Sequence, residues 1–252
     1  MQPIRLNSLP QGEFLTFCND TYDHNNVSLW IEKNRPFELL VNLAKKYRPF
    51  QQDIVHVGSY TGVWDIHQAK QNPSLYFHMF EIQRMAHYAA CGNIALHNVP
   101  NIKANLIGLS DHNTMVRLPV LDYTAPAPYQ QFGLDVTSTD QKFGFKREQD
   151  QIPLVTVDSL RLAPLLINVS GKSELNQIVT GSKKTIQQFE PVVVVCSSQE
   201  GDNPDVRVLL GQGYHMLTVH PHMLVYIPSW LKHVGDIDNM LVSINIQSYN
   251  VG

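Results

Sequence analysis

Asp53-Ile-Val-His-Val-Gly-Ser-Tyr-Thr-Gly62 is the stretch of this sequence that decides its fold. It begins as a short apolar run of the kind that forms a buried parallel strand, and it ends in a turn with two glycines four residues apart. Glycine permits positive φ and lets a ligand approach the backbone. The stretch therefore predicts the first strand of an α/β domain and a ligand-binding turn, with the N–H groups of the next helix facing the ligand.

A second apolar and aromatic run ends abruptly at a carboxylate. This run, Ser74-Leu-Tyr-Phe-His-Met-Phe-Glu81, follows the glycine turn after one helix-length segment. An acid at the end of the second strand is placed to accept hydrogen bonds from ribose hydroxyls, and Glu81 lies about 20 residues beyond the glycines, as in the dinucleotide fingerprint. Alternatively, Glu81 caps a helix that begins near Arg84. We favour ligand binding because the turn and the acid occur together and in order.

Composition narrows the class of protein. The chain has 252 residues, of which 43% are hydrophobic and 16% charged, as is typical of one large soluble α/β domain. A net charge of −3 without a dense Lys/Arg cluster argues against binding to nucleic acid or anionic lipid. The three widely spaced cysteines favour reduced thiols and a cytoplasmic protein. The sequence shows neither a signal-peptide run nor 18 consecutive apolar residues, so we expect neither secretion nor a membrane span.

Helical and strand-like segments alternate along the chain, which predicts a mostly parallel, doubly wound sheet. We expect helices at residues 36–47, 63–72, 84–98, 174–189 and 205–212, and strands at residues 54–57, 75–80, 102–107, 165–169, 191–196, 214–219, 223–227 and 241–246. The closing strands are expected to include an antiparallel hairpin.

The alternation stops at about residues 113–155, where prolines and glycines are interleaved with aromatic residues. We interpret this segment as a structured lobe that shapes an acceptor pocket over the strand ends, covers a sheet edge or contacts another subunit. The expectation is a single domain over residues 1–252, with a lead-in at residues 1–50 and this one insertion.

Six motifs occur in a recognisable order: Ile54-Val-His-Val-Gly-Ser-Tyr-Thr-Gly62, Met79-Phe-Glu81, Asn101-Ile-Lys with Leu109-Ser-Asp111, Val155-Thr-Val-Asp-Ser-Leu160, Ile178-Val-Thr-Gly181 and Pro191-Val-Val-Val-Val195. This series resembles FkbM-type methyltransferases, which use S-adenosylmethionine and have a Rossmann-like fold. The resemblance covers most of residues 35–227. It implies a Rossmann-like class I methyltransferase fold with the closing antiparallel hairpin.

The resemblance also implies S-adenosylmethionine as the cofactor, bound in the crevice at the carboxyl ends of the strands. The methionine part would lie beside the glycine turn, the ribose on the acid of the second strand, and the adenine near the third strand. The residues implied are Gly58, Ser59, Tyr60, Gly62, Glu81 and Ser110, with Asp111 next to Ser110.

The chain departs from the family pattern where the family has polar or acidic residues. His56 stands in place of an aspartate and Tyr60 in place of the turn asparagine. Asn168 and Ser170 replace two carboxylates, and Cys196 falls where an acid often ends the following strand. Among these acidic positions of the family, only Glu81 remains an acid.

Methyl transfer to a hydroxyl needs orientation of the acceptor and a group that takes its proton. Asn168 and Ser170 can orient an acceptor but are poor bases at neutral pH. His56 is the first candidate for the base, and Asp111 or its neighbour His112 is the second. A hydrogen-bonded structural role is the alternative for His56.

These residues support two hypotheses of function. The first is an O-methyltransferase that acts on a sugar or another small hydroxyl acceptor, as a homo-oligomer or within a larger assembly. The second is a catalytically inactive binding or assembly module that keeps the fold. A dehydrogenase is disfavoured because the turn lacks Gly-x-Gly-x-x-Gly. No metal is expected, because His220-Pro-His222 and the other late histidines match no strong zinc spacing.

Overall fold

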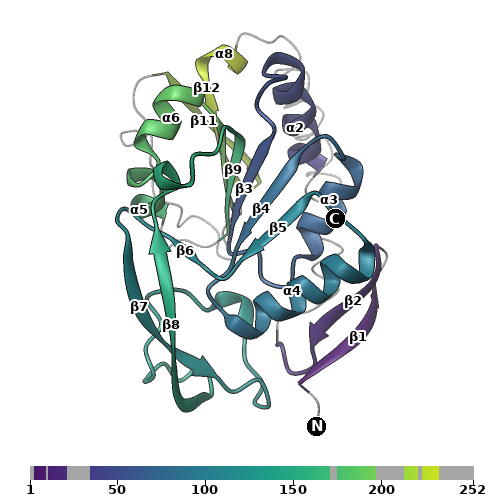
Figure 1. The fold of residues 1–252 in the computed structure, drawn as a ribbon, viewed down its shortest axis with the longest axis vertical. Helices are drawn as coiled ribbons and strands as arrows, with labels where there is room; N and C mark the ends of the chain where they lie inside the picture. Colours follow the sequence, from purple (N-terminus) through teal and green to yellow (C-terminus); the bar gives the residue numbers. More distant parts are fainter. Residues whose placement is uncertain are drawn as a thin grey trace.

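A seven-stranded sheet forms the centre of the molecule (Figure 1). The computed structural model describes residues 3–9, 11–21, 35–170, 175–196, 213–220 and 223–232. The strands of the sheet are β3 (Asp53–Val57), β4 (Tyr76–Phe80), β5 (Ile102–Asn105), β9 (Pro164–Ser170), β10 (Val192–Cys196), β11 (Tyr214–His220) and β12 (Met223–Pro228). Their order across the sheet is β11-β12-β10-β9-β3-β4-β5.

The order and direction of the strands identify the fold. The neighbours of β3 and β9 are all parallel to them, whereas β12 runs antiparallel to both β10 and β11. Counted along the chain from β3 to β12, the spatial order is 6-7-5-4-1-2-3. The dinucleotide-binding order, 3-2-1-4-5-6, lacks the antiparallel seventh strand. The chain therefore has the predicted Rossmann-like class I methyltransferase fold with its closing antiparallel hairpin.

Helices cover both faces of the sheet because side chains alternate along each buried strand. Ile54 packs into one cluster with residues of α2 (Arg35–Tyr47) and α3 (Val63–Gln71). Its neighbour Val55 packs into a second cluster with residues of α5 (Leu175–Thr180) and α6 (Lys183–Phe189). The sequence predicts α5 and α6 as one helix. The structure separates them at Gly181, where a Cβ atom would overlap the carbonyl oxygen of Ser110.

A two-stranded hairpin at the N-terminus forms part of the lead-in, for which the sequence predicts no strands. It consists of β1 (Ile4–Leu9) and β2 (Gly12–Phe17) and lies against α4 (Arg84–His97). The backbone N–H of Leu15 donates to Asn93 Oδ1 at 2.6 Å, and Asn93 Nδ2 donates back to the carbonyl of Leu15 at 3.1 Å. Asn93 thus joins the hairpin to the helix.

The segment predicted as a lobe forms a long antiparallel arm. Its strands β7 (Thr114–Leu121) and β8 (Phe145–Val155) pair along their length, and β8 also pairs with the short β6 (Gly108–Leu109). A 3₁₀ turn, η1 (Tyr129–Gln131), lies between β7 and β8, and a second one, η2 (Val157–Leu160), follows β8.

A final short helix, α8 (Ser229–Lys232), follows β12. The expected helix at 205–212 and strand at 241–246 lie outside the described residues. No helix in the described part of the chain is long and apolar enough to cross a bilayer.

Candidate functional site

The glycine turn between β3 and α3 is held in shape by its neighbours. Gly58, Tyr60 and Gly62 have φ values of 76°, 51° and 74°, all in the left-handed region. A Cβ atom at Gly58 would lie 2.5 Å from the carbonyl oxygen of Ser170, and one at Gly62 would lie 2.7 Å from Met79 Cε. Packing of the turn against β9 and β4 therefore requires both glycines, whether or not a ligand is bound.

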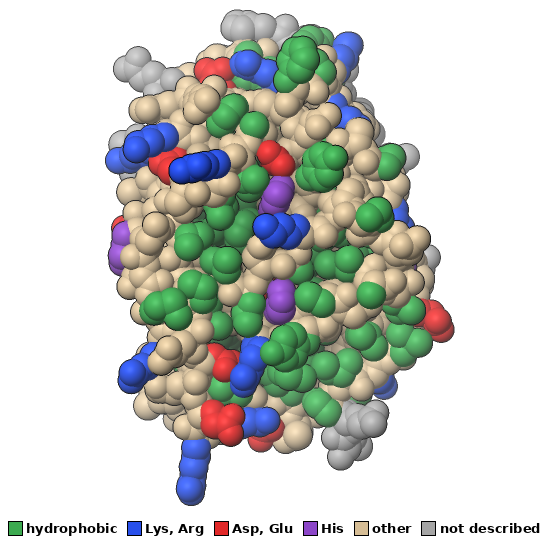
Figure 2. All heavy atoms as spheres, in the orientation of Figure 1, with side chains coloured by type: hydrophobic (Ala, Val, Ile, Leu, Met, Phe, Trp, Pro, Cys, Tyr) green, Lys and Arg blue, Asp and Glu red, His purple; other side chains and the backbone are tan. Residues whose placement is uncertain are grey.

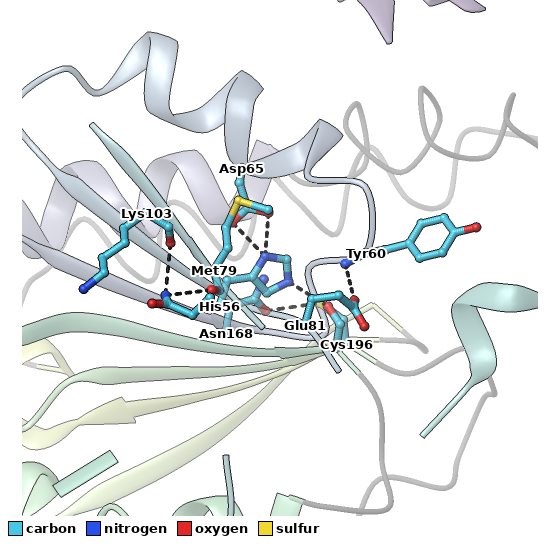
Figure 3. Close-up of polar contacts among 10 residues, drawn as sticks. His56, Tyr60, Asp65, Met79, Glu81, Lys103, Asn168 and Cys196 are labelled. Atoms are coloured by element: carbon cyan, nitrogen blue, oxygen red, sulfur yellow. Dashed lines mark hydrogen bonds and ion pairs between the residues drawn. The ribbon is translucent and has the colours of Figure 1, made fainter. Parts of the chain in front are cut away.

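Glu81, directly after β4, lies inside the protein beneath this turn (Figure 3). Its carboxylate accepts hydrogen bonds from the backbone N–H groups of Tyr60, at 2.7 Å, and Gln83, at 2.8 Å. Burial raises the pKa of Glu81, although hydrogen bonds from the backbone amides of Gln83, Tyr60 and Ile82 oppose that shift. The Glu81 side chain is only 5% exposed. Its two hydrogen bonds connect the glycine turn, through Tyr60, with the start of α4, through Gln83.

The side chain of Tyr60 points away from Glu81 (Figure 3). Its ring centroid lies 5.7 Å from that of Phe17, and its hydroxyl donates to Asp20 Oδ2 at 2.8 Å. Burial and the Asp20 carboxylate raise the pKa of Tyr60 well above its usual value. Tyr60 therefore keeps a neutral hydroxyl that ties the turn to the N-terminal segment.

His56 is the centre of a buried polar group on the α3 side of the sheet. The ring is 3% exposed, and its Nδ1 lies 2.8 and 2.9 Å from the two carboxylate oxygens of Asp65. Its Nε2 lies 3.0 Å from Ser170 Oγ at the end of β9. The edge of the ring contacts Trp64, with centroids 4.9 Å apart. The structure thus joins His56 and Ser170, two of the four predicted catalytic residues, through one contact and adds a buried acid.

Asn168 and Cys196 lie beside this group. Asn168 is paired with His56 across β3 and β9, and its Oδ1 accepts a hydrogen bond from Cys196 Sγ at 3.8 Å. Its Nδ2 atom is buried and has no hydrogen-bond partner in the described part of the chain. Burial raises the pKa of Cys196 to about 12, so its thiol stays protonated. The side chains at 168 and 196 are therefore neutral hydrogen-bonding groups.

The remaining predicted residues lie on the loops at the strand ends. Ser59 is 6% exposed, and its Oγ has no partner among the described residues. Ser110 follows β6, and its Oγ donates to Asp111 Oδ1 at 3.2 Å. Asp111 is exposed, and its hydrogen bond with His112 is the main cause that lowers its pKa. Asp111 therefore bonds to Ser110 and His112 rather than to the His56 group.

Sequence reasoning missed Asp65. It lies nine residues after His56, in the first turn of α3, and its side chain is 0% exposed. Because a βα turn reverses the chain, the first turn of the helix returns over the end of the strand, so Asp65 and His56 meet. An acid in the first turn of a helix is usually explained by its favourable interaction with the helix dipole. Its position in the sequence therefore does not indicate a contact with a histidine.

Across the described ranges, no three or more His, Cys, Asp and Glu side chains are grouped in a way that could hold a metal. Of the histidines considered for a metal, His222 and His233 lie outside those ranges.

Comparisons with known proteins give matches at the level of structure. No protein-family model matches the chain, and no curated protein matches its sequence. One solved structure that it resembles is the methyltransferase FkbM from Methylobacillus flagellatus KT, at 12% identity and a TM-score of 0.47, covering 70% of this chain and 43% of that one. A second is the Pyrococcus abyssi tRNA (uracil-54, C5)-methyltransferase in complex with S-adenosyl-L-homocysteine, at 16% identity and a TM-score of 0.41, covering 89% and 44%.

A third is the precorrin-6y C5,15-methyltransferase from Geobacter metallireducens GS-15, at 10% identity and a TM-score of 0.44, covering 84% of this chain and 91% of that one. This chain spans less than half the length of the Methylobacillus FkbM protein and of the Pyrococcus tRNA methyltransferase. Similarities this low carry no argument about family or substrate, so the fold assignment rests on the strand order of the sheet.

Proposed function

We propose that this protein binds S-adenosylmethionine and transfers its methyl group to a hydroxyl of a small molecule or glycan. The observation that carries the proposal is the position of Glu81. In a sheet of this topology, a ligand is expected at the carboxyl ends of the strands, near the point where the strand order reverses. Glu81 ends the strand next to β3, points inward, and is hydrogen-bonded to the glycine turn.

The residues at this edge suit such a donor. The backbone of residues 58–62 would hold the methionine part, together with Ser59 Oγ, which is buried without a partner in the described ranges. Three backbone amides bond to the Glu81 carboxylate, which leaves one lone pair that would accept a ribose hydroxyl. Ser110 would lie on the adenine side. The bound donor would supply an electrophilic methyl group, and the chain would orient the acceptor toward it.

Charge supports a small or glycan acceptor over nucleic acid. The net charge is −3. On the face shown in Figure 2, Lys and Arg side chains lie among Asp and Glu side chains rather than in one continuous patch. This face therefore lacks the electrostatic footprint of a phosphate-backbone binder. A cytoplasmic location and self-association belong to the same proposal.

Isothermal titration calorimetry with S-adenosylmethionine and S-adenosylhomocysteine tests the proposal. Saturable binding is expected, and Glu81→Gln should weaken it roughly 10- to 100-fold because a neutral amide replaces a charged acceptor. The matched control is Glu190→Gln, since Glu190 is exposed and pairs with Arg48. If neither compound binds at millimolar concentration, the proposal is wrong.

The second candidate function is a binding or assembly module without catalysis. It is favoured by the neutral side chains at 168 and 196, which leave the ends of β9 and β10 without a carboxylate. Incubation of the protein with methyl-labelled donor and a cell extract tests it. Incorporation of label that Glu81→Ala abolishes would exclude this alternative.

A further inference from the structure

Three side chains from three elements form a continuous hydrogen-bonded chain at the carboxyl end of the sheet. Asp65 on α3 contacts His56 on β3 through Nδ1, and His56 contacts Ser170 on β9 through Nε2. The distances are 2.8 Å and 3.0 Å. An acid, an imidazole and a hydroxyl in this order activate the hydroxyl oxygen in many unrelated folds, and the arrangement is recognised by geometry rather than by sequence position.

The contacts define which ring nitrogen of His56 carries hydrogen. An ionised carboxylate can only accept hydrogen bonds, so the contact of both Asp65 oxygens with Nδ1 requires an N–H at Nδ1. In a neutral ring, Nε2 is then a free acceptor, and the Ser170 hydroxyl donates to it. Asp65 therefore fixes the tautomer in which His56 can take a proton from Ser170.

In this series of hydrogen-bonded side chains, the Asp65 end is buried and the Ser170 end is partly exposed. Asp65 is 0% exposed and His56 is 3% exposed, with Trp64 against the ring. Ser170 is only half-buried, and it ends β9 beside Gly58, where the glycine turn begins. Ser170 therefore lies at the strand ends where the proposed donor would bind, while Asp65 is shielded from water.

Asn168 gives a second, independent indication that a ligand belongs at this end. It lies two residues before Ser170, on the same face of β9, and is paired with His56. Its Nδ2 is a buried donor without a partner in the described residues. Buried donors are nearly always satisfied in native proteins, so an unpaired one calls for an acceptor such as an oxygen of a bound molecule.

We propose that Asp65, His56 and Ser170 form a proton relay in which Ser170 Oγ takes the proton of the hydroxyl acceptor. This inference rests on the proposed methyl transfer. The acceptor oxygen forms its bond to the methyl carbon while the carbon–sulfur electron pair stays on sulfur. The acceptor proton passes to Ser170 Oγ, and the Ser170 proton passes to His56 Nε2. Water later removes the proton from His56. Asp65 acts as a positioning residue that stabilises the charged imidazole.

The relay can be tested without a known acceptor, because it also makes Ser170 Oγ nucleophilic. Diisopropyl fluorophosphate is the probe: the Oγ–phosphorus bond forms, fluoride leaves, and the serine proton passes to His56. Mass spectrometry of digested protein locates and times the adduct. Ser170 is expected to react about 100-fold faster than the exposed Ser159. Ser170→Ala should abolish the fast adduct.

Substitutions of the two partners separate a relay from a structural network. Asp65→Asn keeps the shape but lets an amide N–H face Nδ1, which reverses the tautomer and should slow Ser170 labelling about 100-fold. Nitrogen-15 chemical shifts of His56 would show the reversal directly. His56→Gln can still bond to Ser170 but cannot take its proton, so it should also remove the fast reaction if Asp65→Asn fails to fold.

The matched control is Asp53→Asn. Asp53, at the amino end of β3, accepts a hydrogen bond at 2.8 Å from His78 in the middle of β4. The two form a second His–Asp pair, remote from Ser170 at the carboxyl end of β9. This variant should leave Ser170 labelling unchanged.

Three outcomes overturn the relay: labelling of Ser170 no faster than that of Ser159, unchanged labelling in folded Asp65→Asn, or fast labelling that persists in folded His56→Gln. Calorimetry with S-adenosylhomocysteine on the same samples judges the donor site separately. Donor binding with an unreactive Ser170 rejects the relay alone. A reactive Ser170 without donor binding rejects the methyl transfer, and with it the role of the relay toward a methyl acceptor, and leaves only an activated serine.

Discussion

At the scale of single residues, packing alone constrains the glycine turn. A Cβ atom at position 58 would overlap the carbonyl oxygen of Ser170, and one at position 62 would overlap the methyl group of Met79. Tyr60 adopts a left-handed conformation that costs a non-glycine residue about 1–2 kcal/mol. Its backbone hydrogen bond to Glu81 offsets that cost, since hydrogen bonds to charged groups contribute about 1.5–3 kcal/mol.

Gly58→Ala should lower the free energy of unfolding by about 2 kcal/mol or more, because the φ of 76° and the contact with Ser170 both oppose a Cβ atom. Urea denaturation measures the change. Gly144→Ala is the control: its Cβ would lie 3.2 Å from the Cβ of Ala125, and the expected loss is less than about 1 kcal/mol. Equal losses in the two variants would show that the turn is not constrained as described.

At the scale of elements, the break between α5 and α6 explains one of the sequence motifs. Asp158, in the motif Val155–Leu160, accepts hydrogen bonds from the backbone N–H groups of Lys184 and Thr185 and from the Thr185 hydroxyl. These groups belong to the first turn of α6, whose N–H groups have no partner within the helix. The acid therefore caps a helix that lies 25 residues or so further along the chain.

Asp158→Ala should lower the free energy of unfolding by about 1 kcal/mol, the typical cost of losing a helix cap. Thermal unfolding followed by circular dichroism provides the measurement. Asp140→Ala removes a similar acid–amide bond, to the N–H of Lys142, from an exposed loop and should cost less than about 0.5 kcal/mol. A loss in Asp158→Ala no greater than in this control contradicts the capping role.

The sheet could be predicted because each strand carries its own signal. The four valines from Val192 are apolar and buried throughout, as in a strand covered on both faces, and the run ending at Val57 is mostly apolar, with His56 as its one polar residue after Asp53. The helix break at Gly181 could not be predicted, because it depends on Ser110, which is distant in sequence. Local patterns specify elements, whereas contacts between elements decide where they end.

The candidate site was predictable in part for the same reason. His56 and Ser170 stand out because they occupy strand ends where the family that the sequence resembles has acids, and the structure places His56 Nε2 3.0 Å from Ser170 Oγ. Asp65 carried no such signal, since an acid in a first helical turn is common. The N-terminal contact of Tyr60 was equally hidden, because Asp20 lies 40 residues away.

At the scale of the whole molecule, two separate segments pack against the glycine turn in one aromatic cluster. Phe17 from β2 is at its centre, with its ring stacked on Tyr123 at 4.4 Å and also in contact with Tyr60 and Tyr129. Tyr123 and Tyr129 belong to the connection between β7 and β8. The N-terminal hairpin and the connection between β7 and β8, neither of which belongs to the seven-stranded sheet, therefore pack against each other and against the glycine turn.

Phe17→Ala should therefore loosen the hairpin, the connection and the turn together. Phe17 is 0% exposed, and truncation of a buried phenylalanine typically lowers the free energy of unfolding by about 3–5 kcal/mol. Hydrogen–deuterium exchange should rise at residues 12–17, 58–62 and 123–132, while β9 and β10 stay protected at the centre of the sheet. Phe50→Ala, the same change at a side chain that is 95% exposed, should alter neither stability nor exchange. Faster exchange confined to the hairpin would show that the cluster does not couple these segments.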